Sequence, residues 1–254
     1  MKILILGSNG LIGSYIYNIL NLNPNNIIFT VSQKNNNKFR KNHYCLDLNI
    51  DLKKLYKLIL KEEFDQIINC LFIKNKKNKF DTNIPKDIIN YLYKNRFQQI
   101  RWIEISSFSI FLKYKNSYNI EKKNFENFLI KKYRSNLNKL KILRIGNFVN
   151  EPFLSRILFF KFLNIIIIPS KRINKIYLTE IRFLKFFFLN KINSNKVTFN
   201  LITRTNIYEL LKKNTNHKKY FFLNFNAYIF SWIRFFLKGK ISDIFSNFLN
   251  LFFS

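Results

Sequence analysis

The sequence predicts an α/β protein in which a doubly wound parallel sheet is followed by a small C-terminal α+β lobe. Apolar runs alternate with helical patterns through residues 1–150, and the first run passes through a glycine-rich turn into a helix. Strands that alternate with helices form parallel sheets with helices on both faces. We therefore expect one domain over 1–150 and a smaller lobe, which would bind substrate, over 151–254.

The first elements are short and clearly bounded. Residues 2–7 form an apolar run that ends in glycine, which predicts a buried strand. Residues 11–22 carry apolar side chains at helical spacing and stop before a proline. Two further apolar runs predict strands over 27–32 and 43–48.

The remaining elements of the first domain continue the alternation. An amphipathic pattern predicts a helix over 51–63, and an apolar run predicts a strand over 66–73. Pro85 in the first turn of 84–95 is typical of a helix start. The series closes with a strand over 100–108, a helix over 118–133 and a strand over 141–149.

The pattern beyond residue 150 is less regular. Apolar runs predict strands over 165–169, 175–178 and 196–202, and helical spacing predicts helices over 179–190 and 206–214. The last stretch, 221–254, is aromatic and basic, and we expect helices there. Its segment 228–240 has two interpretations: an amphipathic helix at a membrane surface, or the favoured one, a helix of the substrate lobe or of a homodimer contact.

Composition limits the function classes. The formal net charge of +30 is spread along the 254 residues and accompanies an excess of Asn, Ile, Phe and Tyr, all of which have A/T-rich codons. Base composition explains this pattern, so we expect no nucleic-acid partner, although the charge would attract phosphate-bearing substrates. Cys45 and Cys70 have no metal-ligand spacing. We expect two buried free thiols, no metal, and a reducing cytoplasm.

Apolar runs are too short or too interrupted for membrane segments. The run after Met1 is broken by Gly7 and Asn9 before a secretory core forms. No stretch offers about 20 apolar residues without charge, so we expect no transmembrane helix.

A glycine-rich turn, GSNGLIG, joins the first strand to the first helix. It contains Gly7, Gly10 and Gly13, three of only five glycines in the chain. Glycines at this spacing allow a tight turn, close approach of a pyrophosphate and close packing of helix on strand. A helix N-terminus also offers N–H groups to phosphate. The turn predicts a dinucleotide site, although a tight turn without ligand would look the same.

Three polar side chains further along predict catalysis. Tyr118 and Lys122 are one helical turn apart and share a face. A phenol is a poor base at neutral pH, and an ammonium beside it would stabilise the phenolate. The third is a serine, Ser106 or Ser107, near the end of the strand 100–108, where doubly wound sheets bind ligands. Each feature alone has an ordinary structural explanation, but their order along the chain favours a site.

Together these segments resemble the extended short-chain dehydrogenase/reductase family, the Rossmann-type nucleotide-sugar epimerases, dehydratases and reductases. The resemblance rests on GSNGLIG, YCLDL (44–48), INCLF (68–72), Asn83, ISSFSIF (105–111) and RIGNFVN (144–150). Aligning Phe111 with the family's tyrosine in ISSFSIF makes Ser107, and not Ser106, the catalytic serine.

The resemblance implies a catalytic trio of Ser107, Tyr118 and Lys122. It implies NAD or NADP as cofactor, with a nucleotide sugar as substrate and a role in surface polysaccharide biosynthesis. The cofactor-binding residues that it implies are Gly7, Asn9, Gly10, Leu11, Ile12, Gly13, Ser32, Lys34, Asp47, Leu48, Cys70, Leu71, Tyr118 and Lys122.

The sequence departs from the family pattern at three places. The segment between Ser107 and Tyr118 is short, and Ile145 replaces a proline. No acid follows Ser32 to bind a ribose 2′-hydroxyl, whereas Lys34 and Arg40 come soon after, which favours NADP. Two alternatives stay open: a non-catalytic NAD(P)-binding scaffold or regulatory protein on this fold, and, ranked last, a nucleic-acid-binding protein.

Overall fold

The computed structural model describes most of the first domain and part of the remainder. The described residues are 1–33, 41–74, 80–111, 117–148, 166–169, 175–206 and 220–223. The chain forms two compact units. The first contains 1–110, 117–145 and 181–201, and the second contains 111–116, 146–180 and 202–254.

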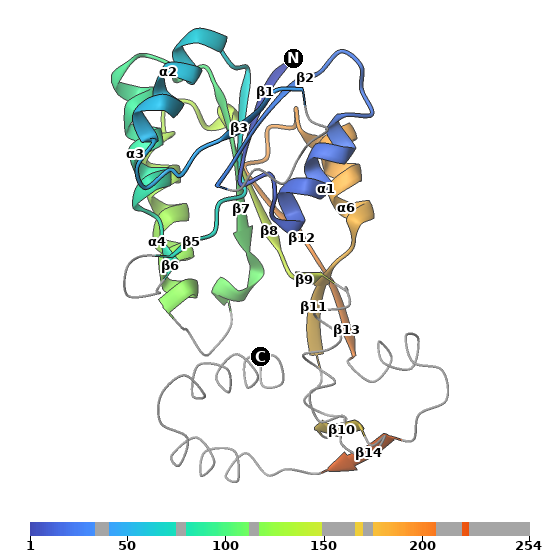
Figure 1. Cartoon of the computed structure of the whole chain (residues 1–254). Coiled ribbons are helices and arrows are strands. Elements are labelled where there is room, and N and C mark those ends of the chain that lie inside the picture. The colour runs from blue at the N-terminus through green and yellow to red at the C-terminus, as the bar shows by residue number, and fades with distance from the viewer. Residues whose placement is uncertain are drawn as a thin grey trace. The chain divides into compact units, whose positions relative to one another are not determined.

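The first unit is built on a parallel sheet of seven strands (Figure 1). In spatial order these are β12 (Thr198–Leu201), β8 (Leu140–Ile145), β7 (Arg101–Ser107), β4 (Gln66–Asn69), β1 (Lys2–Leu6), β2 (Ile27–Ser32) and β3 (His43–Cys45). Because β1 pairs with both β2 and β4, the winding reverses between β1 and β4. The doubly wound parallel sheet is thereby confirmed, and ligands of such sheets bind at this reversal.

Helices cover both faces of the sheet (Figure 1). One face carries α2 (Leu52–Glu62), α3 (Asn83–Lys94) and α4 (Ser117–Lys132). The other carries α1 (Leu11–Leu20) and α6 (Ile181–Phe186), which contact each other. A π-helical turn, Phe187–Lys191, continues α6.

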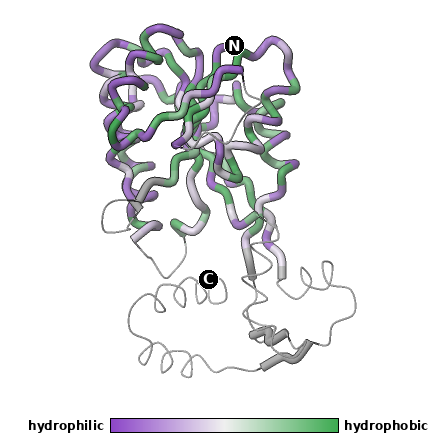
Figure 2. The backbone as a smooth tube through the Cα atoms, viewed as in Figure 1, coloured by the Kyte–Doolittle hydropathy of each residue, from purple (hydrophilic) through white to green (hydrophobic). Residues whose placement is uncertain are grey.

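The core follows the alternation of side chains along the strands. Leu4 and Leu6 of β1 join a buried cluster with side chains of α2, α3 and α4, whereas the buried Ile3 and Ile5 lie outside that cluster. Successive strand residues point to opposite faces, so these two isoleucines point toward the face of the sheet that carries α1. Figure 2 shows the hydrophobic segments concentrated in the sheet. Strands buried on both faces need such continuous apolar runs.

The described elements differ from the predicted ones at a few ends. The predicted strand 66–73 stops at Asn69, and Ile73–Lys74 instead forms β5, which pairs with β6 (Phe80–Asp81) in an antiparallel hairpin. The predicted strand 196–202 supplies β12, which extends the sheet beside β8. Pairing of this kind depends on a partner far away in sequence, which a local pattern does not reveal.

The second unit contains two small sheets among its described residues. β9 (Asn147–Phe148) and β13 (Thr203–Asn206) flank β11 (Lys175–Thr179). The second sheet pairs β10 (Ile166–Pro169) with β14 (Tyr220–Leu223). The expectation of helices from residue 221 is therefore wrong at the start of that stretch. The predicted helix 206–214 and the segment 228–240 lie outside the described residues, except for Asn206, which ends β13.

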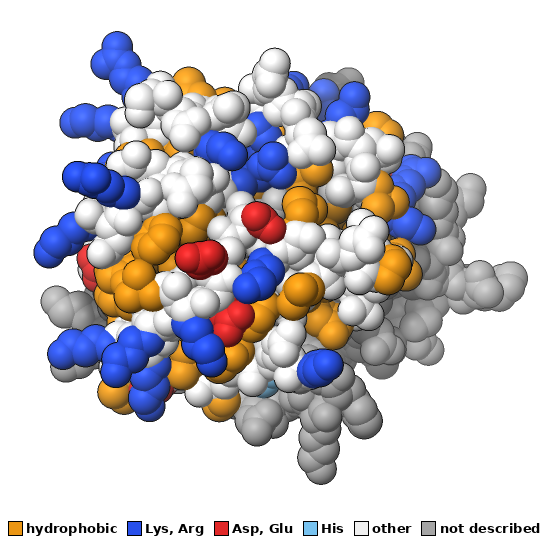
Figure 3. Space-filling model, turned by 90° about the horizontal axis from the view of Figure 1, so that it is seen from above, with side chains coloured by type: hydrophobic (Ala, Val, Ile, Leu, Met, Phe, Trp, Pro, Cys, Tyr) orange, Lys and Arg blue, Asp and Glu red, His pale blue; other side chains and the backbone are white. Residues whose placement is uncertain are grey.

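The described part of the chain lacks a membrane-spanning helix, and its basic side chains are dispersed on the face shown in Figure 3. No helix there is both long and apolar enough to span a membrane. On the face drawn in Figure 3, the coloured Lys and Arg side chains are dispersed among apolar and neutral areas and do not form one continuous patch.

A residue in the left-handed region closes α2 and gives a test of the fold. Glu63 is exposed and has φ 50° and ψ 68°. This conformation costs a residue with a Cβ about 1–2 kcal/mol. We expect Glu63→Gly to raise the free energy of unfolding by about 1 kcal/mol in urea titrations. Lys61→Gly, two residues earlier and within the right-handed helix, should lower it by about 1 kcal/mol; a loss in both variants would contradict the assigned backbone conformation.

Candidate active site

The turn after β1 has no room for a side chain at two of its positions. Gly7 has φ +77°, and a Cβ there would lie 2.8 Å from the carbonyl oxygen of Cys70. A Cβ on Gly13 would overlap the carbonyl oxygen of Gly7. Both positions therefore exclude any side chain, because the first turn of α1 packs directly on the ends of β1 and β4.

Gly10 has a different environment. It is exposed, it caps the N-terminus of α1 without a side-chain hydrogen bond, and a Cβ on it would approach only the carbonyl oxygen of Gly7, at 3.3 Å. The first N–H groups of α1 are thus open to an anion from outside. Asn9 and Ile12 are half-buried beside it and Leu11 is exposed. Residues 9–12 thus form a cradle at the N-terminus of α1 that fits the pyrophosphate of a dinucleotide.

The ends of β2 and β3 carry the next predicted residues. Ser32 is buried, and its Oγ lies 3.2 Å from Nε2 of His43. Asp47 accepts hydrogen bonds from Asn49 and from Nε2 of Gln33, the latter at 3.0 Å. These donors, Asn49 first, lower the pKa of Asp47 below its usual value. Leu48 is buried. Lys34 lies outside the described residues.

Cys70 and Leu71 follow β4, directly opposite Gly7. The amide of Cys70 donates to the carbonyl of Leu6, which continues the pairing of β1 with β4 by one residue. Burial raises the pKa of the Cys70 thiol, so this group is neutral at physiological pH. The expectation that both cysteines are buried is wrong for Cys45, which is exposed where β3 ends, and Cys70 is half-buried.

Ser107 begins a chain of hydroxyl groups at the end of β7. Its Oγ lies 2.7 Å from Oγ of Ser109, and Ser109 donates to Oδ1 of Asn119 at 2.6 Å. A hydroxyl has one proton to donate, so Ser107 is the donor toward Ser109. Ser106 points inward: it is buried, and its Oγ has no hydrogen-bond partner among the described residues.

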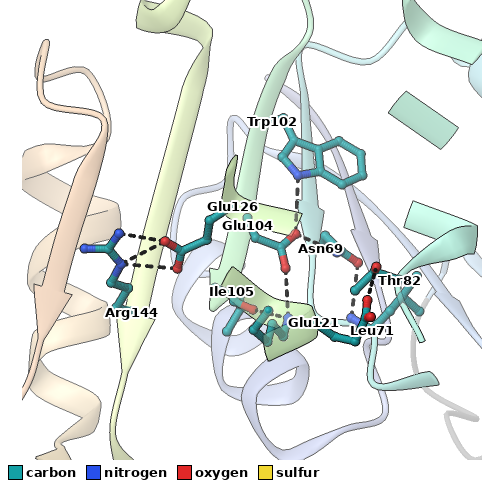
Figure 4. A network of polar contacts seen from close by, with 10 residues as sticks. Asn69, Leu71, Thr82, Trp102, Glu104, Ile105, Glu121, Glu126 and Arg144 are labelled. Carbon is teal, nitrogen blue, oxygen red and sulfur yellow. Dashed lines mark hydrogen bonds and ion pairs between the residues drawn. The ribbon is translucent and has the colours of Figure 1, made fainter. Parts of the chain in front are cut away.

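Tyr118 and Lys122 lie on α4 with different exposure. Tyr118 is half-buried, and its ring centroid lies 5.7 Å from that of Phe72. Lys122 is buried, and its Nζ donates to Oε1 of Glu104 at 2.9 Å and to the carbonyl of Ile105 at 2.8 Å (Figure 4). Lys122 is thus held against β7, close to the strand end that carries Ser107.

Several residues of this region were not predicted from the sequence. Glu104, Asn69, Ser109 and Asn119 contact predicted site residues directly or through one another. Glu104 interrupts the apolar run 102–105 of a strand expected to be covered on both faces, which signals a buried charge but does not reveal its partner. Ser109 and Asn119 are common residue types in turns and helix starts, and only their 2.6 Å contact singles them out.

The first part of the chain matches the model of a known protein family. Residues 3–128 match the model of the NAD dependent epimerase/dehydratase family. A search of curated proteins finds no match to the chain.

Solved structures share the fold at low sequence identity. UDP-glucuronic acid 4-epimerase from Bacillus cereus, in complex with NAD, has 16% identity and a TM-score of 0.68, with 88% of each chain covered. dTDP-glucose 4,6-dehydratase from Bacillus anthracis, in complex with NAD, has 13% identity and a TM-score of 0.66 over 89% of this chain and 85% of the other. L-threonine 3-dehydrogenase from Trypanosoma brucei has 13% identity and a TM-score of 0.65 over 89% and 84%.

The different surroundings of the glycines give a test of the cradle. We expect Gly10→Val to abolish binding of NADH, measured by fluorescence, because its side chain would occupy the space above the N-terminus of α1. The protein should still fold, since only one atom lies near the new Cβ. Gly13→Ala should instead fail to fold or lose much of its thermal stability. Unchanged NADH affinity in Gly10→Val would contradict this location of the site.

Proposed function

The chain carries a domain of the NAD dependent epimerase/dehydratase family, and we propose that it is an NAD(P)-dependent oxidoreductase, epimerase or dehydratase that acts on a nucleotide sugar. The proposal rests mainly on one observation, the way in which α4 is joined to the end of β7. Lys122 binds the carbonyl of Ile105, and Asn119 binds Ser109, which in turn contacts Ser107. These contacts tie α4, the helix of Tyr118 and Lys122, to the strand end that carries Ser107, and this supports a shared site for the three predicted catalytic residues.

Each residue of the trio has a distinct role in the proposal. When bound, the nicotinamide supplies the chemistry of hydride transfer. Tyr118 moves the proton of the substrate hydroxyl as a general acid–base. Ser107 directs its hydroxyl to the same substrate oxygen, which requires exchange of its bond to Ser109. Lys122 places a positive charge beside Tyr118 and toward the cofactor ribose.

The cofactor site in the proposal extends along the edge where β1 and β4 end. The cradle at Gly10 takes the pyrophosphate, Asp47 and Leu48 border the adenosine end, and Cys70 and Leu71 lie along the nicotinamide end. The neutral side chains after β4 offer no cation to a phosphate and suit the flat nicotinamide ring better. This order agrees with the rule that ligands of doubly wound sheets cross the point of strand reversal.

A nucleotide sugar is favoured as the substrate for two reasons. Two of the structurally similar proteins carry nucleotide-sugar names, and the charge of +30 attracts a diphosphate. A role in surface polysaccharide biosynthesis, a cytoplasmic location, a homodimer and contact with a membrane surface stay predictions from the sequence.

Tyr118→Phe tests the chemistry most directly. The change removes the transferable proton and keeps the ring against Phe72. We expect turnover with a nucleotide-sugar substrate to fall about 10²–10⁴-fold, with NADH affinity almost unchanged. Ser107→Ala should also lower turnover, whereas Ser106→Ala, whose Oγ is buried away from the site, should change it much less.

Lys122→Ala is a less selective variant, because it leaves Glu104 buried without its cation and so destabilises the fold. It should lower both turnover and NADH affinity. The measurement is steady-state kinetics at the absorbance of reduced nicotinamide, screened over nucleotide sugars. Full turnover in Tyr118→Phe would contradict the catalytic proposal, and binding of NADH without turnover on any substrate would favour the scaffold.

The preference between NAD and NADP gives a separate test. We expect tighter binding of NADP, because no carboxylate follows β2 and Lys34 and Arg40 come soon after it. Asp47, held next to Gln33, works against this preference by repelling a 2′-phosphate. Titration calorimetry with both nucleotides decides the matter, and Lys34→Ala should weaken NADP binding alone. Clearly tighter binding of NAD by the unmodified protein would overturn the preference.

A further inference from the structure

A carboxylate is buried in the middle of the central sheet. Glu104 lies on β7 with none of its surface exposed, on the face where Trp102 packs under α4. Strands covered on both faces are normally apolar there. A buried carboxylate is tolerated only where partners replace its hydration, so Glu104 needs a specific explanation.

Three N–H donors, from three elements, surround this carboxylate (Figure 4). Lys122 of α4 binds Oε1 at 2.9 Å. Asn69, at the end of β4, donates to Oε2 at 2.6 Å, and the indole N–H of Trp102 donates to the same oxygen at 3.4 Å. Each oxygen therefore has a partner, and the group is held in one orientation.

The charge of Lys122 depends on this contact. Burial by itself lowers the pKa of Lys122, but the Glu104 carboxylate, together with Tyr118 and the hydrogen bond, more than compensates and raises it above the usual value. Burial raises the pKa of Glu104, and the donors from Lys122, Asn69 and Trp102 oppose this shift. Cys70, the other titratable group nearby, is neutral. The 2.9 Å distance between Nζ of Lys122 and Oε1 of Glu104 is that of an ion pair.

The same network reaches the loop predicted to line the cofactor. Asn69 donates to Glu104 through its amide nitrogen, and its amide oxygen accepts the backbone N–H of Leu71 at 3.2 Å. Leu71 is one of the predicted cofactor-binding residues. Glu104 thus connects α4, which carries Tyr118 and Lys122, to the turn after β4.

A second buried ion pair joins α4 to the sheet and provides a comparison. Glu126 of α4 accepts three hydrogen bonds from the guanidinium of Arg144 of β8, the shortest at 2.6 Å. Both carboxylates are buried and both pairs link α4 to a strand, although Arg144 is half-buried whereas Lys122 is buried. Neither Glu126 nor Arg144 belongs to the predicted site, so this pair isolates the structural effect of losing a buried carboxylate.

We propose that Glu104 is a positioning residue, which holds Lys122 charged and aimed along β7 and couples it through Asn69 to the cofactor-lining turn after β4. The inference rests on the proposed function, since the ligand at this edge is taken to be a nicotinamide dinucleotide. Glu104 itself contacts neither the cofactor nor the substrate in this proposal.

Glu104→Gln is the central experiment, with Glu126→Gln as the matched control. Both variants lose one buried negative charge between α4 and the sheet, and both should lower the thermal midpoint. Only Glu104→Gln should weaken NADH binding, by about tenfold at pH 7.5, as expected for a lost bond to a charged group. Equal affinities in the two variants would overturn the proposal, because the pair would then act on stability alone.

The pH dependence of NADH binding adds a second readout. Without the carboxylate, burial dominates and the pKa of Lys122 falls, so its ammonium is lost at a lower pH. NADH affinity of Glu104→Gln should therefore decline as pH rises from 6 to about 9, over a range where the unmodified protein and Glu126→Gln stay level. Parallel profiles in all three proteins would count against Glu104.

A labelling experiment on the protein without ligand separates this proposal from the proposed function. Trace acylation with acetic anhydride at a series of pH values, read by mass spectrometry, reports the protonation of Lys122. We expect its profile to move to lower pH in Glu104→Gln and to stay in place in Glu126→Gln. If the unmodified protein binds neither NADH nor NADPH, the proposed function fails, and the labelling shift still decides whether Glu104 controls Lys122.

A variant with a shortened side chain covers the case in which Glu104→Gln does not fold. Glu104→Asp keeps the charge but withdraws the carboxylate by one methylene group. Its NADH affinity should fall by less than tenfold, and its pH profile should stay level because the anion remains. A labelling profile for Lys122 that moves in Glu104→Asp as far as expected for Glu104→Gln would contradict a role through charge.

Discussion

The parallel pairing of β1 with both β2 and β4 is the constraint on which the rest of this structure depends. Parallel strands need crossover connections, and these place helices on both faces. They also bring the carboxyl ends of all seven strands to one edge. Gly7, Cys70 and Ser107 follow or end three of these strands and so meet at that edge although they are far apart in sequence.

Close packing at the reversal point explains why glycine is concentrated there. The turn after β1 touches the backbone after β4 so closely that Gly7 and Gly13 have no room for a Cβ. Gly10, by contrast, is open to solvent. The same seven residues therefore serve two purposes: two glycines allow the first helix to pack, and the third leaves space for an anion.

The seam between α4 and β7 combines apolar packing with buried charge. Phe125 and Leu129 of α4 belong to the core, while Lys122 and Glu104 lie in the same interface. A buried ion pair adds little net stability compared with apolar contacts, because desolvation offsets most of the attraction. Its value lies in geometry: Lys122 has one defined position, and its two strand partners fix that position relative to Ser107.

Local patterns of residues were enough to predict the order of the main elements of the first domain, the strand–glycine–helix turn and the shared helix face of Tyr118 and Lys122. These features are local, because a turn that needs glycine and a spacing of four on a helix require no knowledge of distant residues. The three-dimensional fold was needed to find that Glu104 is bound by Lys122, that Ser109 links Ser107 to Asn119 and that β12 joins the sheet beside β8. Each of these depends on a partner from another element, and the pattern around Glu104 does not reveal which side chain of another element meets its carboxylate.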